Sequence, residues 1–161
     1  MFFLLATPQY NNSQSNITKV KVHLRNGIAE IFDQHQDLMG KVENNLIEIE
    51  SFSENKIEKS VFVLQDAVFI VSNQGLNTTP ENKETTVYIY AKNAKEISGN
   101  TSFDAYVAEY EKKNGELAVE TEKIAQENAA GKGQTLTPKL FLLTEEVEFL
   151  KKVVSISKNW K

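Results

Sequence analysis

Hydrophobic residues recur with two different periods along the chain. Up to about residue 100, apolar side chains occupy alternate positions and clusters of Gly, Asn, Asp or Ser interrupt them, which is typical of antiparallel strands. The predicted strands cover residues 2–7, 20–24, 28–32, 46–50, 61–65, 68–72 and 87–91. Residues 9–16 and 73–84 are predicted loops, and Asn26-Gly27 predicts a hairpin turn. Because many short strands bury both faces best as two packed sheets, we expect a β-sandwich of about ten antiparallel strands.

Beyond residue 100 the apolar spacing becomes that of helices. Residues 102–128 predict one long amphipathic helix, with Ser102 as its cap and Gly131 to Gly133 at its end. Its apolar seam is Phe103, Val107, Tyr110, Leu117 and Ile124. Thr137-Pro138 begins a second helix. Its seam is Leu140, Leu143, Val147, Leu150 and Val154. The sequence therefore predicts a β-sandwich domain over residues 1–98 and a C-terminal helical hairpin over residues 99–161.

Composition excludes several classes of function. The hydrophobic fraction of 40% and the charged fraction of 25% are those of a folded globular chain. A net charge of −4, with scattered basic residues and a single arginine, argues against a nucleic-acid partner. The absence of cysteine excludes disulfides and thiolate chemistry. No apolar run approaches the roughly 20 residues of a membrane-spanning helix, so we expect no membrane insertion.

Candidate catalytic chemistry is sparse. His23 and His35 are the only histidines, and neither belongs to a metal-spaced cluster. His35 follows Asp33, so an acid–base pair in a small hydrolase is one hypothesis, but no serine stands in a nucleophile-elbow pattern. Residues 131–135 superficially resemble a phosphate loop, but they lack its first glycine and spacer. We therefore expect no catalytic, cofactor-binding or metal-binding residue, and a backbone-bonded His35.

The stretch from Gly27 to Leu38 carries a family resemblance. Gly27, Ile31, His35 and Leu38, followed by an apolar run at 46–49, resemble the Gly-Glu-x-Gly-Ile-x-Pro-Gly-His-x-x-Leu segment of the epsilon subunit of F1-type ATPases. The opening strand that ends in Thr7-Pro8 resembles that of the same family. The resemblance implies a non-catalytic subunit bound to a gamma-like rotating shaft, and through it to a catalytic alpha/beta hexamer. In this family the sandwich couples the shaft to a membrane rotor ring, and the hairpin can restrain rotation.

Three departures from the family pattern fall in the same stretch. Ile28 and Glu30 replace a glutamate and a glycine, and Asp33-Gln34 replaces Pro-Gly before the histidine. These changes put the ring contact in doubt. The first helix has Phe103-Asp104-Ala105-Tyr106-Val107 and lacks the family's Asp-x-x-Arg-Ala motif, so nucleotide binding is not expected. The departures suggest a divergent complex with a specialised role such as motility, in a bacterial cytoplasm at the membrane periphery.

Partner binding is expected at the loop stretch and at the helical seams. The expected contact residues are Ile28, Glu30, Asp33, Gln34, His35, Leu38, Phe103, Tyr110, Leu143 and Leu150. The seams can instead be intramolecular core. An alternative function is a stand-alone β-sandwich adaptor that dimerises through its C-terminal helices.

Overall fold

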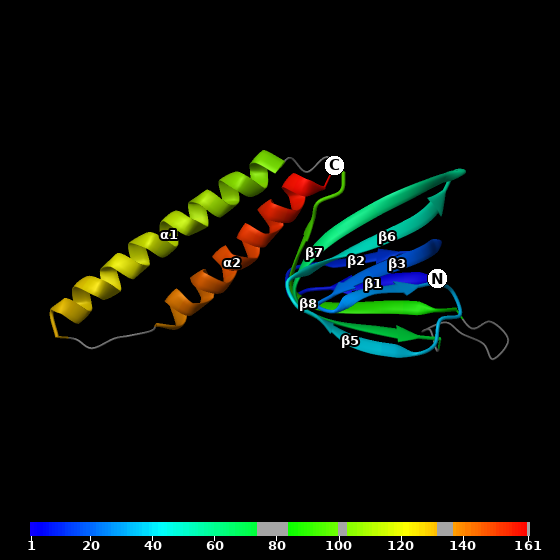
Figure 1. Cartoon of the computed structure of the whole chain (residues 1–161), viewed down its shortest axis with the longest axis horizontal. Helices are drawn as coiled ribbons and strands as arrows, with labels where there is room; N and C mark the ends of the chain where they lie inside the picture. Colours follow the sequence, from blue (N-terminus) through cyan, green and yellow to red (C-terminus); the bar gives the residue numbers. More distant parts are fainter. Residues whose placement is uncertain (74–83, 100–102, 132–136, 161) are drawn as a thin grey trace. The chain divides into compact units, whose positions relative to one another are not determined.

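A computed structural model describes residues 1–73, 84–99, 103–131 and 137–160. The chain divides into two compact units, Met1–Asn100 and Thr101–Lys161. The first unit holds the strands β1 (Phe2–Ala6), β2 (Asn11–Gln14), β3 (Ile17–Leu24), β4 (Gly27–Ile31), β5 (Leu38–Val42), β6 (Asn45–Ser53), β7 (Lys56–Ser72) and β8 (Thr86–Glu96). The second unit holds the helices α1 (Phe103–Ala129) and α2 (Pro138–Asn159). Figure 1 shows these elements along the chain and labels all of them except β4.

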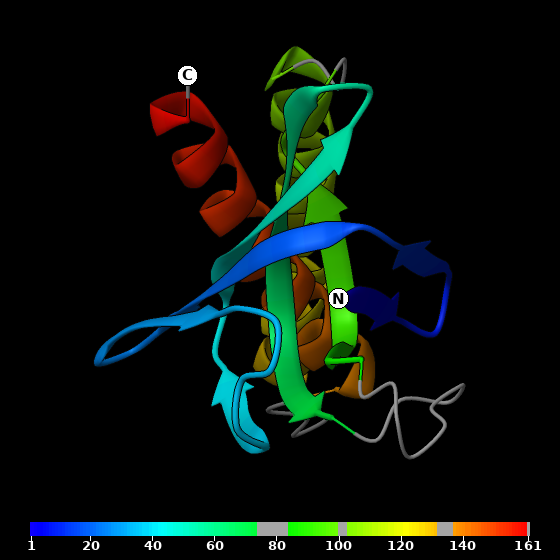
Figure 2. The ribbon, with the colours of Figure 1, turned by 90° about the vertical axis from the view of Figure 1, so that its right-hand side faces the viewer.

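The strands of the first unit form one sheet that folds over on itself. Their order is β2-β1-β8-β7-β6-β3-β4, and β5 pairs with β7 off this path. Strand β7 is 17 residues long, and Asp66, whose φ is 44°, divides it. Its first part pairs with β6 and its second part with β5. Because one strand serves both pairings, the sheet has two layers, and β3 crosses β7 and β8 in Figure 2.

The core lies between these layers. The strands that line it contribute alternate side chains, as the period of two requires, whereas the polar edge strand β2 has no residue in the core. The largest fully buried side chains of this unit are Phe3, Phe62, Phe69, Leu5, Ile31, Ile47, Ile49, Leu64, Ile89 and Val20. The packing is close at Gly40, where an added Cβ would lie 2.4 Å from Cε1 of Phe69. Glycine is therefore required for β5 to approach β7.

The predicted fold class is confirmed, with a β domain followed by two packed helices. The structure differs in the strands: the described residues form eight, and the pairing of β1 with β8 is parallel. The predicted loop at 9–16 contains β2, whose four residues are all polar because it lies at the sheet edge. Strand β5 falls where none is predicted, and the two strands predicted at 61–65 and 68–72 are one. The predicted connection at 73–84 lies mostly outside the described residues.

In the second unit α1 and α2 run antiparallel (Figure 1). Ion pairs join them, among them Lys113 Nζ to Glu146 Oε2 at 3.2 Å and Lys139 Nζ to Glu120 Oε2 at 2.6 Å. Helix α2 begins at Thr137-Pro138 as predicted, and Thr137 caps it, because its hydroxyl accepts a hydrogen bond from the Leu140 backbone amide at 3.1 Å. Within the described part of the chain, neither helix is long and apolar enough to cross a membrane.

The predicted helical seams are partly correct for both helices, since Leu140 and Val154 of the predicted α2 seam are only half-buried. Leu143, Val147 and Leu150 are buried in α2, with Phe149 and Val153 beside them. In α1 the buried residues are Tyr106, Glu120 and Ile124. Phe103 is 39% exposed, and Val107, Tyr110 and Leu117 are half-buried. Helix α1 ends at Ala129 before Gly131, whose φ is 81°, whereas the predicted Ser102 cap and Gly133 lie outside the described residues.

Candidate partner-binding surfaces

Side chains at the ends of β7 and β8 hold the loop between β4 and β5. The Gln34 amide donates to the Thr85 hydroxyl at 2.7 Å, and the Thr85 amide donates to Oδ1 of Asp33 at 3.4 Å. The Thr85 hydroxyl in turn donates to Oδ1 of Asn73 at 2.7 Å. The Asn73 side-chain amide donates to the His35 carbonyl at 2.6 Å. Thr85 is fully buried, so the loop is tied to the body of the sheet.

These contacts indicate a structural loop. Nδ1 of His35 lies 2.8 Å from the carbonyl oxygen of the neighbouring Gln36, and the His35 backbone amide donates to the Phe32 carbonyl at 3.2 Å. His35 is therefore bonded to backbone, as predicted. Across residues 1–73, 84–99, 103–131 and 137–160, no three His, Asp or Glu side chains gather in a way that could hold a metal ion.

The residues expected from the Gly27–Leu38 stretch lie in three places. Asp33, Gln34 and His35 form the tied loop. Ile28 and Glu30 lie on β4, on the side of the sheet that faces away from the core, where Glu30 Oε1 is 3.1 Å from Lys21 Nζ. Leu38 begins β5, pairs with Val71 and is 37% exposed. The structure therefore places these residues on the outer side of one strand, in a tied loop and at the start of another strand.

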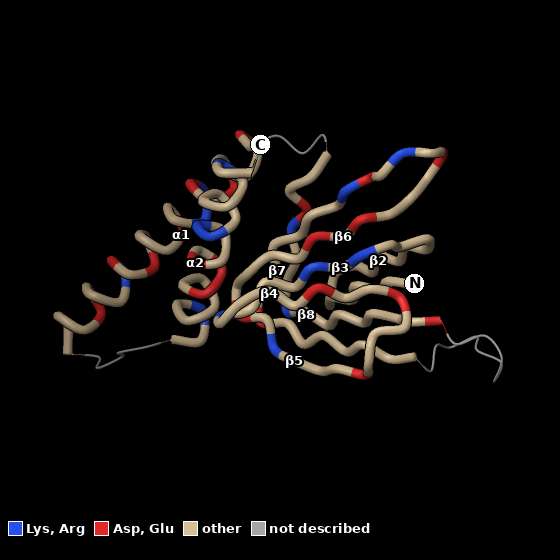
Figure 3. The backbone as a smooth tube through the Cα atoms, turned by 45° about the vertical axis from the view of Figure 1, so that its right-hand side comes forward, with Lys and Arg blue, Asp and Glu red and all other residues tan. Residues whose placement is uncertain are grey.

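One half of the outer surface of the sheet carries paired charges, and we call it the charged face. Its members are Lys19, Lys21, His23, Glu30, Glu48, Glu50 and Lys59. Glu48 is central, because one carboxylate oxygen lies 2.7 Å from Nε2 of His23 and the other contacts Nζ of Lys59. Lys19 Nζ lies 2.8 Å from Glu50 Oε2. Figure 3 shows the opposite charges side by side on β3 and β6.

Glu48 is buried, with 6% of its surface exposed. Burial raises the pKa of its carboxyl group, but the hydrogen bonds from Lys59 and His23, together with their charges, lower it by more. The net effect is a pKa below the ordinary value of 4.5. Glu48 therefore stays ionised at neutral pH, and both of its oxygens have partners within the sheet.

A second part of the outer surface is apolar. We call it the apolar face, and its members are Leu4, Met39, Val68, Ile70, Tyr88 and Tyr90. Leu4, Tyr88, Ile70 and Met39 are successive cross-strand partners on β1, β8, β7 and β5. Tyr90 pairs with Val68 in the adjacent row. Met39 is 71%, Tyr90 50% and Val68 40% exposed, and these side chains point outward because their strand neighbours lie in the core.

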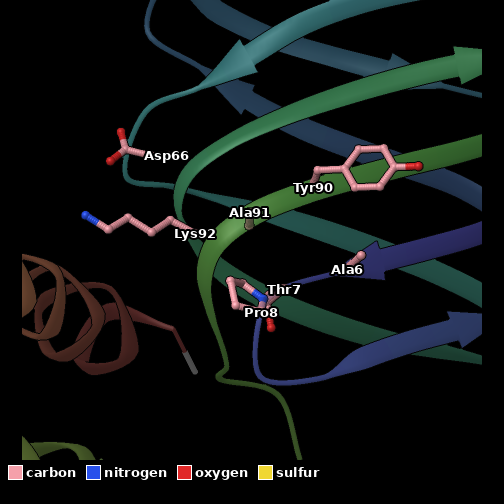
Figure 4. Close-up of a pocket in the computed structure, with 7 residues that line it drawn as sticks. All are labelled: Ala6, Thr7, Pro8, Asp66, Tyr90, Ala91 and Lys92. Atoms are coloured by element: carbon pink, nitrogen blue, oxygen red, sulfur yellow. The ribbon is translucent and has the colours of Figure 1, made fainter.

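A hollow of about 370 Å³ lies at the end of the apolar face. Its lining residues are Ala6, Thr7, Pro8, Asp66, Tyr90, Ala91 and Lys92. In Figure 4 the ring of Tyr90 lies along β8, and Ala6 and Pro8 lie on the neighbouring segment of the chain. Asp66 and Lys92 lie at the opposite end of the hollow from the Tyr90 ring. The Thr7-Pro8 pair that contributed to the sequence resemblance thus forms part of the wall.

Sequence reasoning missed the apolar face. The apolar face could have been predicted from residues 67–71 and 87–91, where every position is apolar. A strand of that kind has apolar side chains on both sides of its sheet. Only one side can face the core of a two-layered unit, so the other needs a second apolar surface or stays exposed.

The four residues expected on the helices differ in exposure. Leu143 and Leu150 are buried, Tyr110 is half-buried and Phe103 is exposed. The large exposed apolar residues elsewhere on the two helices are Val119, Phe141 and Leu142, at 68%, 50% and 58%. A hollow of about 340 Å³ adjoins Val119 and the Glu120–Lys139 ion pair.

Comparisons with known proteins find the fold but no sequence relative. No protein-family model and no curated protein matches the chain. A chain in the cryo-EM structure of the Tetrahymena thermophila mitochondrial ATP synthase central stalk and c-ring matches with a TM-score of 0.45 and 13% identity, over 60% of this chain and 66% of that chain. That match spans just under two thirds of the Tetrahymena chain.

A second match covers nearly the whole chain. It is a chain in the cryo-EM structure of the Euglena gracilis mitochondrial ATP synthase that comprises OSCP, F1 and the c-ring, with a TM-score of 0.54 and 10% identity. It covers 96% of this chain and 79% of that chain. The resemblance found in the sequence is thus confirmed at the level of the fold, and the chain shares its combination of β unit and helix pair with a chain of a mitochondrial ATP synthase.

Proposed function

We propose that this chain is a non-catalytic subunit of the central stalk of an F1-type ATPase. It binds a gamma-like shaft and, through the shaft, acts on the catalytic alpha/beta hexamer. The observation that carries the proposal is the match over 96% of the chain, because it includes the strands and the helices together. A β-sandwich alone is compatible with many functions. Its combination with a helical pair reduces the number of compatible functions.

The surfaces of the chain support a binding role. The tied loop between β4 and β5 uses His35 for backbone contacts, and the apolar face offers tyrosines, which are enriched in protein interfaces. Hydrolysis of ATP then belongs to the other subunits of the complex. The chain needs no cofactor for such a role.

Co-purification tests this proposal. A tagged copy expressed in its own organism should bring down a gamma-like shaft subunit together with catalytic ATPase subunits, in fixed stoichiometry. The purified chain alone should hydrolyse no ATP, and His35→Ala should leave the ATPase activity of the complex intact. A tagged chain that recovers neither a shaft nor a catalytic subunit would overturn the proposal.

A finer proposal concerns the role of the complex. The altered residues Ile28, Glu30 and Asp33-Gln34 favour an ATPase that drives a specialised machine, such as one for motility, over one that contacts a proton-driven ring. Mass spectrometry of the intact complex tests this, because the specialised form should lack ring subunits. A ring recovered in fixed ratio to the tagged chain would contradict it.

A second candidate function is an adaptor that dimerises through its helices. The exposed side chains of Val119, Phe141 and Leu142 favour it, since apolar groups on helices often mark contact surfaces. Sedimentation of the pure chain should then depend on concentration, and Leu142→Asp should abolish that dependence. A monomer at all concentrations excludes the adaptor and leaves the stalk proposal in place.

A further inference from the structure

We infer that Asn26 is a site of spontaneous covalent modification, where the side-chain amide becomes a carboxylate and the backbone partly becomes an isoaspartyl linkage. An asparagine followed by glycine is the pair most prone to this reaction, because glycine has no side chain to obstruct it. The chain contains two such pairs, Asn26-Gly27 and Asn114-Gly115. Only the first has a backbone that permits the reaction in the folded state. The inference concerns the chain itself and does not depend on the proposed function.

The reaction needs only the chain and water. The backbone nitrogen of Gly27 bonds to the side-chain carbonyl carbon of Asn26, and the bond from that carbon to the side-chain nitrogen breaks. The proton of the attacking nitrogen leaves with the ammonia, and a succinimide ring remains. Water then adds to one of the two ring carbonyls and breaks its bond to the ring nitrogen. Opening at the side-chain carbonyl gives aspartate, whereas opening at the main-chain carbonyl gives isoaspartate.

The two pairs have similar surroundings. Asn26, Gly27, Asn114 and Gly115 are all exposed, and each asparagine follows a basic residue. Neither asparagine side chain makes a hydrogen bond to another of the described residues. A Cβ added at either glycine would meet nothing within 4 Å. Solvent access and side-chain contacts therefore do not distinguish the two pairs.

The backbone protects Asn114. Gly115 lies near the middle of the 27-residue helix α1, where each amide donates to the carbonyl four residues before it. The succinimide ring also requires a ψ far from the helical value of about −42°. Asn114 can therefore react only after the helix unwinds there, and unwinding the middle of a helix interrupts a cooperative structure.

The backbone leaves Asn26 accessible. Asn26 is the second of the two residues between β3 and β4, and Leu24–Gly27 is the last pair of their ladder. In Figure 2 this turn, in blue, projects beyond the neighbouring strands. The end of a ladder opens at a low free-energy cost. Such an opening lets the backbone nitrogen of Gly27 approach the Asn26 side chain while the rest of the sheet stays folded.

The modification changes the charge and the geometry of the β3–β4 hairpin. Both products carry a negative charge at neutral pH that Asn26 lacks. Isoaspartate also inserts a side-chain carbon into the backbone, so the turn no longer fits the Leu24–Gly27 pair. The effect falls on β4, because within the described part of the chain β4 is an edge strand that pairs only with β3. The contact of Glu30 with Lys21, at 3.1 Å in the intact chain, should then weaken.

Ageing of the purified chain in mildly alkaline buffer tests the site, since the attacking nitrogen reacts after losing its proton. Peptide mapping by mass spectrometry measures aspartate and isoaspartate at both pairs over time. In the folded chain Asn26 should react at least about tenfold faster than Asn114, because only the end of a ladder has to open. In concentrated urea the two rates should agree within about twofold, because both backbones are then unfolded. Equal rates in the folded chain, or faster reaction at Asn114, would overturn the inference.

The matched variant is Asn26→Gln, which keeps the side-chain amide but would have to close a larger ring. Its product at position 26 should accumulate at least about tenfold more slowly than that of the wild type, while Asn114 in urea reacts as before. Hydrogen exchange then measures the consequence for β4. Fresh samples of the two proteins should exchange alike, and after equal ageing the β4 amides should exchange faster in the wild type. Equal exchange in the two aged proteins would overturn the loosening of β4.

Discussion

The charged face and the apolar face both point away from the core. They differ in how far their side chains find partners on neighbouring strands. On the charged face each acid has a base from a neighbouring strand, so Glu48 with His23 and Lys59 is complete without a partner protein. On the apolar face the cross-strand neighbours are apolar too, except for Lys41 opposite Val68, and Met39 and Tyr90 remain half exposed or more. Cross-strand pairing can therefore complete a polar surface, whereas an apolar one needs a second molecule or element.

The sharpest test of this contrast compares the apolar face with the core directly behind it. Phe69→Ala should destabilise the chain by about 3–5 kcal/mol, because it removes a fully buried ring. Its strand neighbour Val68 faces outward, and Val68→Thr should change the free energy of unfolding by less than about 0.5 kcal/mol. Urea unfolding measures both, and similar losses would mean that Val68 is part of the core.

Strand β5 offers the next test. Gly40→Ala should cost about 1–3 kcal/mol, because the new Cβ would meet the ring of Phe69 and force it to move. Met39→Ala, one residue away on the apolar face, should leave stability within about 0.5 kcal/mol of the wild type. A stable Gly40→Ala variant in urea would show that the ring of Phe69 has room to relax.

Within the charged face, burial should rank the acids. Glu48→Gln should destabilise the chain by about 1–2 kcal/mol, because it removes the charge that both His23 and Lys59 contact. Glu50→Gln should cost less, since its single contact with Lys19 is more exposed. Urea unfolding measures both variants. A larger drop in the urea midpoint for Glu50→Gln than for Glu48→Gln would contradict the prediction that burial ranks the two acids.

The smallest expected effect is the pH dependence of that difference. The pKa of Glu48 lies below 4.5 in the folded state, so its contribution is fully present above its unfolded pKa and is lost as pH falls through the folded value. The stability gap between the wild type and Glu48→Gln should therefore be constant near neutral pH and shrink as the pH falls below the ordinary carboxyl value and through the lower pKa of the folded state. A gap that widened on acidification would contradict the assigned direction of the pKa.

Local sequence signals predicted most of the helices and strands. They did not predict how the strands pair, because pairing depends on residues far apart in the chain. Asn26-Gly27 gave the β3–β4 hairpin and Thr137-Pro138 the start of α2, because each depends on residues next to it in the chain. The parallel pairing of β1 with β8 depends on residues more than eighty positions apart. No local period encodes it.

The candidate site follows the same logic. Leu4, Met39 and Tyr88 belong to one row only because the strands pair in the order β1-β8-β7-β5. The sequence predicted the strands of that row except β5. It did not predict which strands pair with one another. The buried position of Tyr106 in α1 was missed for a related reason: a long helix has several apolar stripes, and packing selects among them.

Strand β7 has a mechanical consequence. Because the chain continues without interruption through Asp66, a pull applied at Val68 reaches the β6–β7 ladder along covalent bonds. The nine residue pairs of that ladder are then loaded along the strand axis, so their hydrogen bonds resist together and do not open one after another. A force along β7 would therefore be shared by the whole ladder and would not be concentrated on one residue pair at a time.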